Sequence, residues 1–427
     1  MVAPHCDDET LGAGGLVFDA VRRGASAYVV LMTNGDGFTL GARREFLSLR
    51  TDSARLIEFG YLRQRESLEA LGVLGVPEEH VFFLGYPDRG LAAMWHEHWD
   101  QRNPYVSKYT RASASPYANS YRANAPYYGE DVVQVLEDII MKTRPSIILT
   151  SAPVDGHADH WATYNFVMYA CEDLRERGLL PPAQPRVLWY VVHRGEWPYP
   201  KGLRPDMELW PPRGLGIDSV RWLSYRLSGD AVIAKADAIR KYRSQMLIMA
   251  RYLLSFARTT ELFAEATSEA VPWTASPGPA IDGRLGDWPA ATGTGMRVHA
   301  EPVNDCLLRQ FGGAGDFTGM VVARDETNLY LGLWVRRAAS REIVYRVHLH
   351  PVGGRSRVGP EGDVDIAFRP GRPGAVSVRS PAGSGRDLSD ISAASRGREI
   401  EMKIPLRLLG NPRTLFVAVE SRFQGIM

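Results

Sequence analysis

Two short clusters of histidine and aspartate could do chemistry in this 427-residue chain: PHCDDE at residues 4–9 and DGHADH at residues 155–160. Imidazole and carboxylate groups bind catalytic zinc, and a set of two histidines and one carboxylate leaves a coordination position for water. The same set also suits ferrous iron. We therefore expect His5, Asp8 and His160 to bind Zn²⁺, with Fe²⁺ as the alternative.

The remaining residues of the two clusters suit a hydrolase that uses a metal-activated water. Neighbouring side chains of extended chain diverge, so Asp7 is free to act as the general base while Asp8 faces the metal. His157 lies three residues before His160, a spacing that places both on one face of a helical turn. We expect His157 in protonated form to stabilise charge on the substrate carbonyl oxygen, with Asp155 or Asp159 holding its ring as a second shell around the site.

Each cluster also has a plainer interpretation. Two aspartates before an apolar helix often cap its N-terminus, and two histidines spaced by three often begin a solvated helix. Both clusters, however, follow an expected strand and open an expected helix, which favours the metal site. We interpret His96, His98, His348 and His350 as packing residues, and Cys6 as a buried small side chain rather than a nucleophile.

The elements between the clusters alternate short apolar strands with amphipathic helices, which predicts an α/β fold. We expect a Rossmann-like three-layer α/β/α sandwich with a mostly parallel sheet, in which both clusters lie at the carboxyl edge where ligands bind. The expected strands cover residues 27–32, 81–84, 147–150 and 187–192, and the expected helices cover 11–23, 53–74, 130–142, 160–177 and 230–256. Residues 90–129 lack periodicity and are rich in tyrosine and tryptophan, so they either pack on themselves or form a sugar-stacking wall.

The helical pattern stops near a proline-rich segment, which predicts a domain boundary. We expect a catalytic domain over residues 1–265, a linker over 266–278 and an all-β sandwich over 279–427. The expected strands of the sandwich cover residues 317–323, 329–335, 343–349, 364–368, 400–404 and 415–420.

The composition of the chain limits the classes of binding partner that we expect. Fifty basic and forty-nine acidic residues give a net charge of +1, which argues against a nucleic-acid binder and suits a carbohydrate or small-molecule partner. Three scattered cysteines predict no disulfide framework, and no apolar run is long enough to cross a bilayer. The chain shows no signal-peptide pattern, yet Val2 and Ala3 resemble the end of a buried strand, so either a cytoplasmic protein or an exported one that has lost its signal fits.

The pattern Pro-His-x-Asp-Asp-Glu-x-Leu-Gly-x-Gly-Gly, with the later His-x-Asp-His, resembles the PIG-L or LmbE-like N-acetylglucosaminyl deacetylases. Further agreements are RxxExxxAxxxLG at 63–75, FLGYPD at 83–88, YRSQ at 242–245 and ELF at 261–263, so the resemblance covers about residues 1–265. It implies a zinc enzyme with the ligands and general base given above, and it implies substrate binding by Arg63 and Asp88. Pairing of Arg63 with Glu66 on a helix surface is the alternative for that residue. Cys6 departs from the family, which usually has proline there.

The second domain is similar to family 9 carbohydrate-binding modules through AIDGRLGDW at 280–288 and NLYL at 328–331. We expect Trp288 to anchor the core rather than a sugar, and glycan anchoring by this domain is a hypothesis. The sequence as a whole predicts an N-deacetylase acting on a GlcNAc-like amino sugar in a glycan, glycolipid or glycoconjugate. An amidase that releases a larger acyl group and a catalytically silent glycan-binding protein are the alternatives.

Overall fold

The structure, a computed structural model, describes residues 1–48, 50–215, 220–266, 271–274, 278–288, 299–300, 313–352, 364–371, 376–379 and 390–423. The chain divides into two compact units, Met1–Thr267 and Ser268–Met427. Each unit has hydrophobic clusters of its own. Among the described residues, none of the helices combines the length and the apolar character that a bilayer crossing needs.

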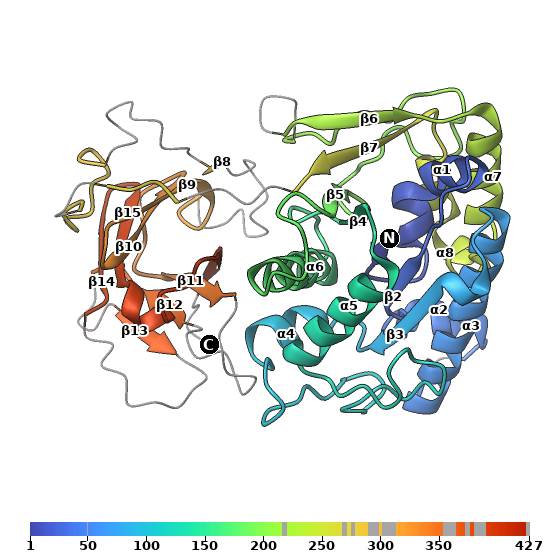
Figure 1. The fold of residues 1–427 in the computed structure, drawn as a ribbon, viewed down its shortest axis with the longest axis horizontal. Coiled ribbons are helices and arrows are strands. Elements are labelled where there is room, and N and C mark those ends of the chain that lie inside the picture. Colours follow the sequence, from blue (N-terminus) through green and yellow to red (C-terminus); the bar gives the residue numbers. More distant parts are fainter. Residues whose placement is uncertain are drawn as a thin grey trace. The chain divides into compact units, whose positions relative to one another are not determined.

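The first unit is an α/β fold in which helices and strands alternate along much of the chain (Figure 1). Its elements are, in chain order, β1 (Val2–Ala3), α1 (Asp8–Arg22), β2 (Val29–Thr33), α2 (Thr39–Glu45), α3 (Ser53–Val73), β3 (Val81–Tyr86), α4 (Leu91–His96), α5 (Gly129–Thr143), β4 (Ile147–Ser151), α6 (Ala158–Glu176), β5 (Arg186–Tyr190), β6 (Trp222–Arg226), α7 (Gly229–Ile239), α8 (Arg243–Leu253) and β7 (Thr260–Glu265).

The strands form two sheets that meet at β1 and β4. Strands β1, β2 and β3 pair in parallel, and β4 pairs in parallel with β5. Strand β1 also contacts β4, although it pairs with β2. Each of these two central strands is followed by one histidine–aspartate cluster, so both clusters lie where the strand order changes direction, the place at which open α/β sheets bind ligands.

The structure corrects two expectations about this unit. The sheet is less parallel than predicted, because β7 pairs antiparallel with both β5 and β6. The single helix expected over residues 230–256 is instead two helices, α7 and α8, which end and begin around Tyr242. The break lets the buried Tyr242 reach α1, where its hydroxyl lies 2.8 Å from Thr10 Oγ1 and also contacts Glu9.

Helix α1 is interrupted at Ala13, whose φ of −144° is not helical. The interruption frees backbone groups that a buried ion pair satisfies. The Glu261 carboxylate accepts hydrogen bonds from the N–H groups of Gly15 and Leu16, at 2.8 and 2.9 Å, and lies 2.6 Å from Lys235 Nζ. The Lys235 ammonium in turn donates to the carbonyl oxygen of Leu11. The helix that carries the first cluster is therefore fixed to α7 and β7 by charge as well as by packing.

The second unit consists of antiparallel β-sheets. Its elements are β8 (His299–Ala300), β9 (Phe317–Arg324), β10 (Asn328–Val335), β11 (Ile343–Pro351), β12 (Val364–Phe368), β13 (Val376–Arg379), β14 (Ser392–Arg396), β15 (Glu399–Pro405) and β16 (Leu415–Phe423). The sheets have the orders β14-β15-β10-β9-β8 and β13-β12-β11-β16, and both contribute side chains to one buried cluster. All six strands expected in this region are confirmed.

Trp288 lies in the core of this unit. Its side chain is fully buried, and its indole N–H donates to Glu401 Oε1 at 2.5 Å. The other oxygen of Glu401 accepts a hydrogen bond from the N–H of Gly283. The AIDGRLGDW stretch therefore has a packing function, and glycan binding by this unit stays a hypothesis.

Candidate metal and catalytic site

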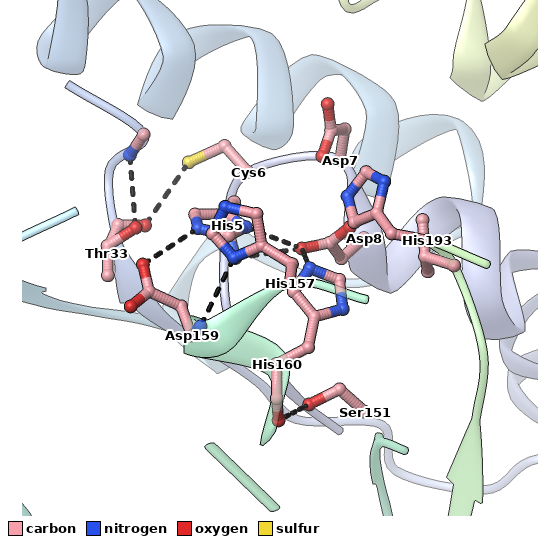
Figure 2. Close-up of polar contacts among 12 residues, drawn as sticks. His5, Cys6, Asp7, Asp8, Thr33, Ser151, His157, Asp159, His160 and His193 are labelled. Atoms are coloured by element: carbon pink, nitrogen blue, oxygen red, sulfur yellow. Dashed lines mark hydrogen bonds and ion pairs between the residues drawn. The ribbon is translucent and has the colours of Figure 1, made fainter. Parts of the chain in front are cut away.

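The carboxylate of Asp8 lies between two histidines from distant parts of the chain. Asp8 Oδ2 is 3.0 Å from His5 Nδ1 and 3.0 Å from His160 Nε2, and all three side chains are buried (Figure 2). His5 lies in the turn between β1 and α1, and His160 lies in the first turn of α6. The fold thus brings together the three residues that we expect to bind a metal.

The donor groups fit a divalent cation. Both ring nitrogens of His160 are buried, and no described residue gives either a hydrogen bond of acceptable geometry. Burial opposes ionisation of Asp8, but the neighbouring His160 and His5 hold the pKa of this carboxyl well below its usual range. Within the described parts of the chain, three sets of residues have ligand atoms within 4.8 Å of one another: His5, His157 and His160; Asp8, His160 and His193; and His5, Asp88 and Asp159. A buried carboxylate among imidazoles is the ligand type that zinc and iron prefer.

Two further carboxylates orient His5. Asp159 Oδ2 lies 3.2 Å from His5 Nε2, and Asp88 Oδ1 lies 3.4 Å from the same nitrogen. Asp159 is held by the backbone N–H of Arg89 at 2.6 Å, and Asp88 by that of Gly37 at 2.8 Å. Asp88 is therefore a buried partner of His5, and substrate binding by Asp88 stays a prediction. Because Nε2 faces these acceptors, Nδ1 is the nitrogen that is available toward Asp8.

The surroundings of His157 also differ from the prediction. Neither Asp155 nor Asp159 holds its ring through a carboxylate: Asp155 Oδ2 lies 3.2 Å from His160 Nδ1, and Asp159 lies at His5. Nδ1 of His157 instead accepts a hydrogen bond from the backbone N–H of Asp159 at 3.2 Å. Burial and the nearby rings of His5 and His160 lower the pKa of His157 to about 3. A pKa in this range favours a neutral ring, and a ring that accepts at Nδ1 then carries its proton on Nε2.

Asp7 is held in a strained conformation beside the metal-binding cluster. Its φ of 124° is rare for a residue other than glycine, and such strain concentrates at functional sites. This backbone turns the Asp7 carboxylate away from Asp8 (Figure 2). Burial raises the pKa of Asp7 to about 8, against the opposing charge of Arg63. A carboxyl with a pKa in this range suits a group that both takes and returns a proton near neutral pH.

The buried guanidinium of Arg63 holds the Asp7 carboxylate in place. The guanidinium is 4% exposed and lies 3.2 Å from Asp7 Oδ2, while it also donates to the carbonyl oxygens of Cys6 and Gly35. Surface pairing of Arg63 with Glu66 is wrong, because Arg63 is buried. Substrate binding by Arg63 stays a prediction, and in the structure its guanidinium contacts Asp7, Cys6 and Gly35.

The sequence reasoning missed His193, which follows β5. Its ring centroid is 4.8 Å from that of His160 and 5.7 Å from that of His157, and the ring stacks on Tyr252. Burial and the charge of His160 lower its pKa to about 4. The residue comes directly after the strand expected at 187–192, so the rule that located the other clusters at the carboxyl ends of strands could have found it.

The aromatic segment at 90–129 belongs to the first unit and contains the short helix α4. Tyr117 and Tyr127 are buried, and their hydroxyls donate to Asp36 Oδ2 at 2.6 Å and to the carbonyl oxygen of Gly85 at 3.0 Å. These two tyrosines are therefore packing residues, but they pack against the domain core rather than on the segment itself. Tyr105 differs, because it is only partly buried and the charges of the nearby site help to raise its pKa, after burial as the largest cause.

Residues 1–171 match the family model described as PIG-L, GlcNAc-PI de-N-acetylase. The chain is 26% identical over 277 residues to 1D-myo-inositol 2-acetamido-2-deoxy-alpha-D-glucopyranoside deacetylase of Corynebacterium glutamicum strain R, a match that covers 63% of this chain and 80% of the relative. The protein of the same name from Tsukamurella paurometabola is 30% identical over 205 residues, which cover 46% of this chain and 63% of the relative.

Among solved structures, N,N'-diacetylchitobiose deacetylase from Pyrococcus horikoshii is 19% identical, with a TM-score of 0.38 over 62% of this chain and 82% of that one.

Proposed function

We propose that the first unit is a metal-dependent hydrolase that removes the acetyl group from the nitrogen of a GlcNAc-like amino sugar in a glycan, glycolipid or glycoconjugate. One observation carries the proposal: a buried carboxylate lies 3.0 Å from imidazoles of two distant segments, inside a domain that matches a de-N-acetylase family. The names of the curated relatives describe deacetylation of a 2-acetamido sugar, which supports the substrate class.

In this proposal His5, Asp8 and His160 hold the ion, for which Zn²⁺ is our first choice and Fe²⁺ the alternative. The ion would act as a Lewis acid and lower the pKa of water toward ~7. Asp7, fixed by Arg63, accepts the proton of the attacking water and later returns it to the amine as the C–N bond breaks. Neutral His157 donates its Nε2–H to the acetamide oxygen as charge develops there. The products are acetate and the free amino sugar.

The test is a screen of N-acetylated sugars for released acetate and new primary amine, with metal-stripped protein as the blank. We expect Asp7→Asn to keep its metal and to lose about 10²–10⁴-fold in turnover. His160→Ala should lose both metal and turnover. Asp230→Asn is the matched control, because this carboxylate is exposed on α7 and pairs with the surface residue Arg22.

Each alternative has its own signature. Equal metal loss in Asp7→Asn and His160→Ala would contradict Asp7 as the base. Release of a longer acid from N-acyl analogues, with no acetate from N-acetylated sugars, would favour the amidase. Tight glycan binding without hydrolysis by the metal-loaded protein would favour the silent binding protein.

A further inference from the structure

His193 faces the metal-binding cluster from a third strand. Its ring lies beside the Asp8 carboxylate in the close-up of the site (Figure 2). A ring nitrogen of His193, a ring nitrogen of His160 and a carboxylate oxygen of Asp8 lie within 4.8 Å of one another. The three ligands expected from the sequence come from the segments after β1 and β4, whereas His193 follows β5.

A neighbouring hydroxyl sets the tautomer of His193. The Tyr252 hydroxyl donates its one proton to the carbonyl oxygen of Val192 at 2.7 Å. The hydroxyl oxygen of Tyr252 also lies 3.1 Å from His193 Nδ1. Because that proton is already used, the hydroxyl oxygen accepts from Nδ1–H. The neutral ring then carries its lone pair on Nε2, the form in which imidazole binds a metal.

The backbone of His193 is fixed to the same loop that holds His160. Asp155 Oδ2 accepts the N–H of His193 at 3.0 Å and lies 3.2 Å from His160 Nδ1. The N–H of Gly156 donates to the carbonyl oxygen of His193 at 2.6 Å, and a Cβ on Gly156 would meet that oxygen at 2.8 Å. One Asp-Gly pair thus sets the positions of two histidines. Support of this kind from an outer carboxylate is typical of metal ligands.

We propose that His193 Nε2 is a further metal-binding nitrogen of this site, so that the ion has three imidazoles and the Asp8 carboxylate as protein ligands. The inference rests on the metal centre of the proposed function and adds one residue to it. Room for water at such an ion requires five-coordination, which catalytic zinc sites can reach.

Each of the three imidazoles then has its second nitrogen protonated and facing an oxygen outside the metal site. Nε2 of His5 faces Asp159 at 3.2 Å, Nδ1 of His160 faces Asp155 at 3.2 Å, and Nδ1 of His193 faces the Tyr252 hydroxyl. The proposal therefore predicts three exchangeable imidazole N–H protons beside the ion. Co²⁺ in place of zinc shifts such protons far from the bulk of the NMR spectrum, so they can be counted in the unaltered protein.

The experiment compares wild type, His193→Gln, Tyr252→Phe and the control His80→Gln, a histidine whose ring lies 4.1 Å from that of Tyr28 and whose Nδ1 contacts the carbonyl oxygen of Ala27. We expect three shifted N–H signals in Co²⁺-loaded wild type and two in His193→Gln. X-ray absorption of the zinc forms should likewise lose one imidazole. The Kd for zinc should rise by at least ~10-fold in His193→Gln and by about 10-fold in Tyr252→Phe, with no change in the control.

Two N–H signals in wild type, or a zinc Kd in His193→Gln within about twofold of wild type, would overturn the assignment of His193 and leave the proposed function standing. Absence of specific metal binding by wild type would overturn both. The signal count uses wild type alone, so it decides the question even where a variant does not fold.

Discussion

Replacement of Glu261 by glutamine tests how α1 is held in place. Glu261 and Lys235 have side-chain exposures of 1% and 0%, and their charges lie 2.6 Å apart. The carboxylate also accepts two backbone N–H groups at the interruption of α1. Glutamine offers one oxygen where the carboxylate offers two, and its amide N–H₂ would face a donor.

The expected loss follows from this geometry. Removal of one partner of a buried ion pair leaves an uncompensated charge and costs about 3–5 kcal/mol. At about 2–4 °C per kcal/mol for a unit of this size, Glu261→Gln should lower the first unit's unfolding temperature by about 6–20 °C. Lys235→Met should cost less, because the Glu261 carboxylate keeps its two backbone donors. The double variant should lose at least ~1 kcal/mol less than the sum of the single losses, since it leaves no buried charge unpaired.

Differential scanning calorimetry of the full chain is the assay, because two units can unfold in separate transitions. Glu265→Gln, on the same strand β7, is the control: its partner Arg186 is 50% exposed and the pair should contribute at most ~1 kcal/mol. Equal shifts in Glu261→Gln and Glu265→Gln, or fully additive losses in the double variant, would refute the reasoning.

Three further predictions concern stability. Gly12→Ala should lower the free energy of unfolding of the first unit by about 1–3 kcal/mol, because the new Cβ would lie 2.2 Å from the Tyr190 ring. The control Gly72→Ala has open space around the new Cβ and should leave this free energy unchanged or raise it. Burial opposes the charge on His348, but a hydrogen bond to Asp365 helps raise its pKa to about 9, so its charged form stabilises the second unit below pH ~6.5 and this stability is lost as the pH rises through 9. Melting at pH 6 and 9.5 should show this loss in wild type and much less of it in His348→Gln; equal losses would contradict it. Zinc at ~100 times its Kd should stabilise the first unit by about 2.7 kcal/mol, and an equal effect of zinc on His160→Ala would contradict the site.

Much of the first unit could be predicted because it depends on local patterns, although the short helices α2 and α4 and the strands β6 and β7 were not expected. Apolar runs such as Ile147–Ser151 and amphipathic segments such as Gly129–Thr143 appear in the structure within a few residues of their expected bounds. The break between α7 and α8 could not be predicted in this way. It depends on a contact between Tyr242 and α1 that spans 232 residues of chain.

In the candidate site, too, some features follow from the sequence and others depend on the folded structure. Its residue types and their places after strands β1 and β4 follow from sequence spacing and from the rule for ligand sites in open sheets. The partner of each carboxylate does not follow, because hydrogen bonds connect whichever groups the fold places within ~3 Å. Asp159 therefore contacts His5, and Asp155 contacts His160. Arg63 pairs with Asp7 rather than with Glu66 at the surface.

Residue identity and periodicity were enough to predict the edge of the sheet at which two clusters meet and the all-β character of the second unit. Distances between remote groups had to come from the folded chain, because burial and long-range contacts set them. Those distances decide which nitrogen of each imidazole is available, turn the Asp7 carboxylate away from Asp8, and add His193 to the groups around a candidate metal ion.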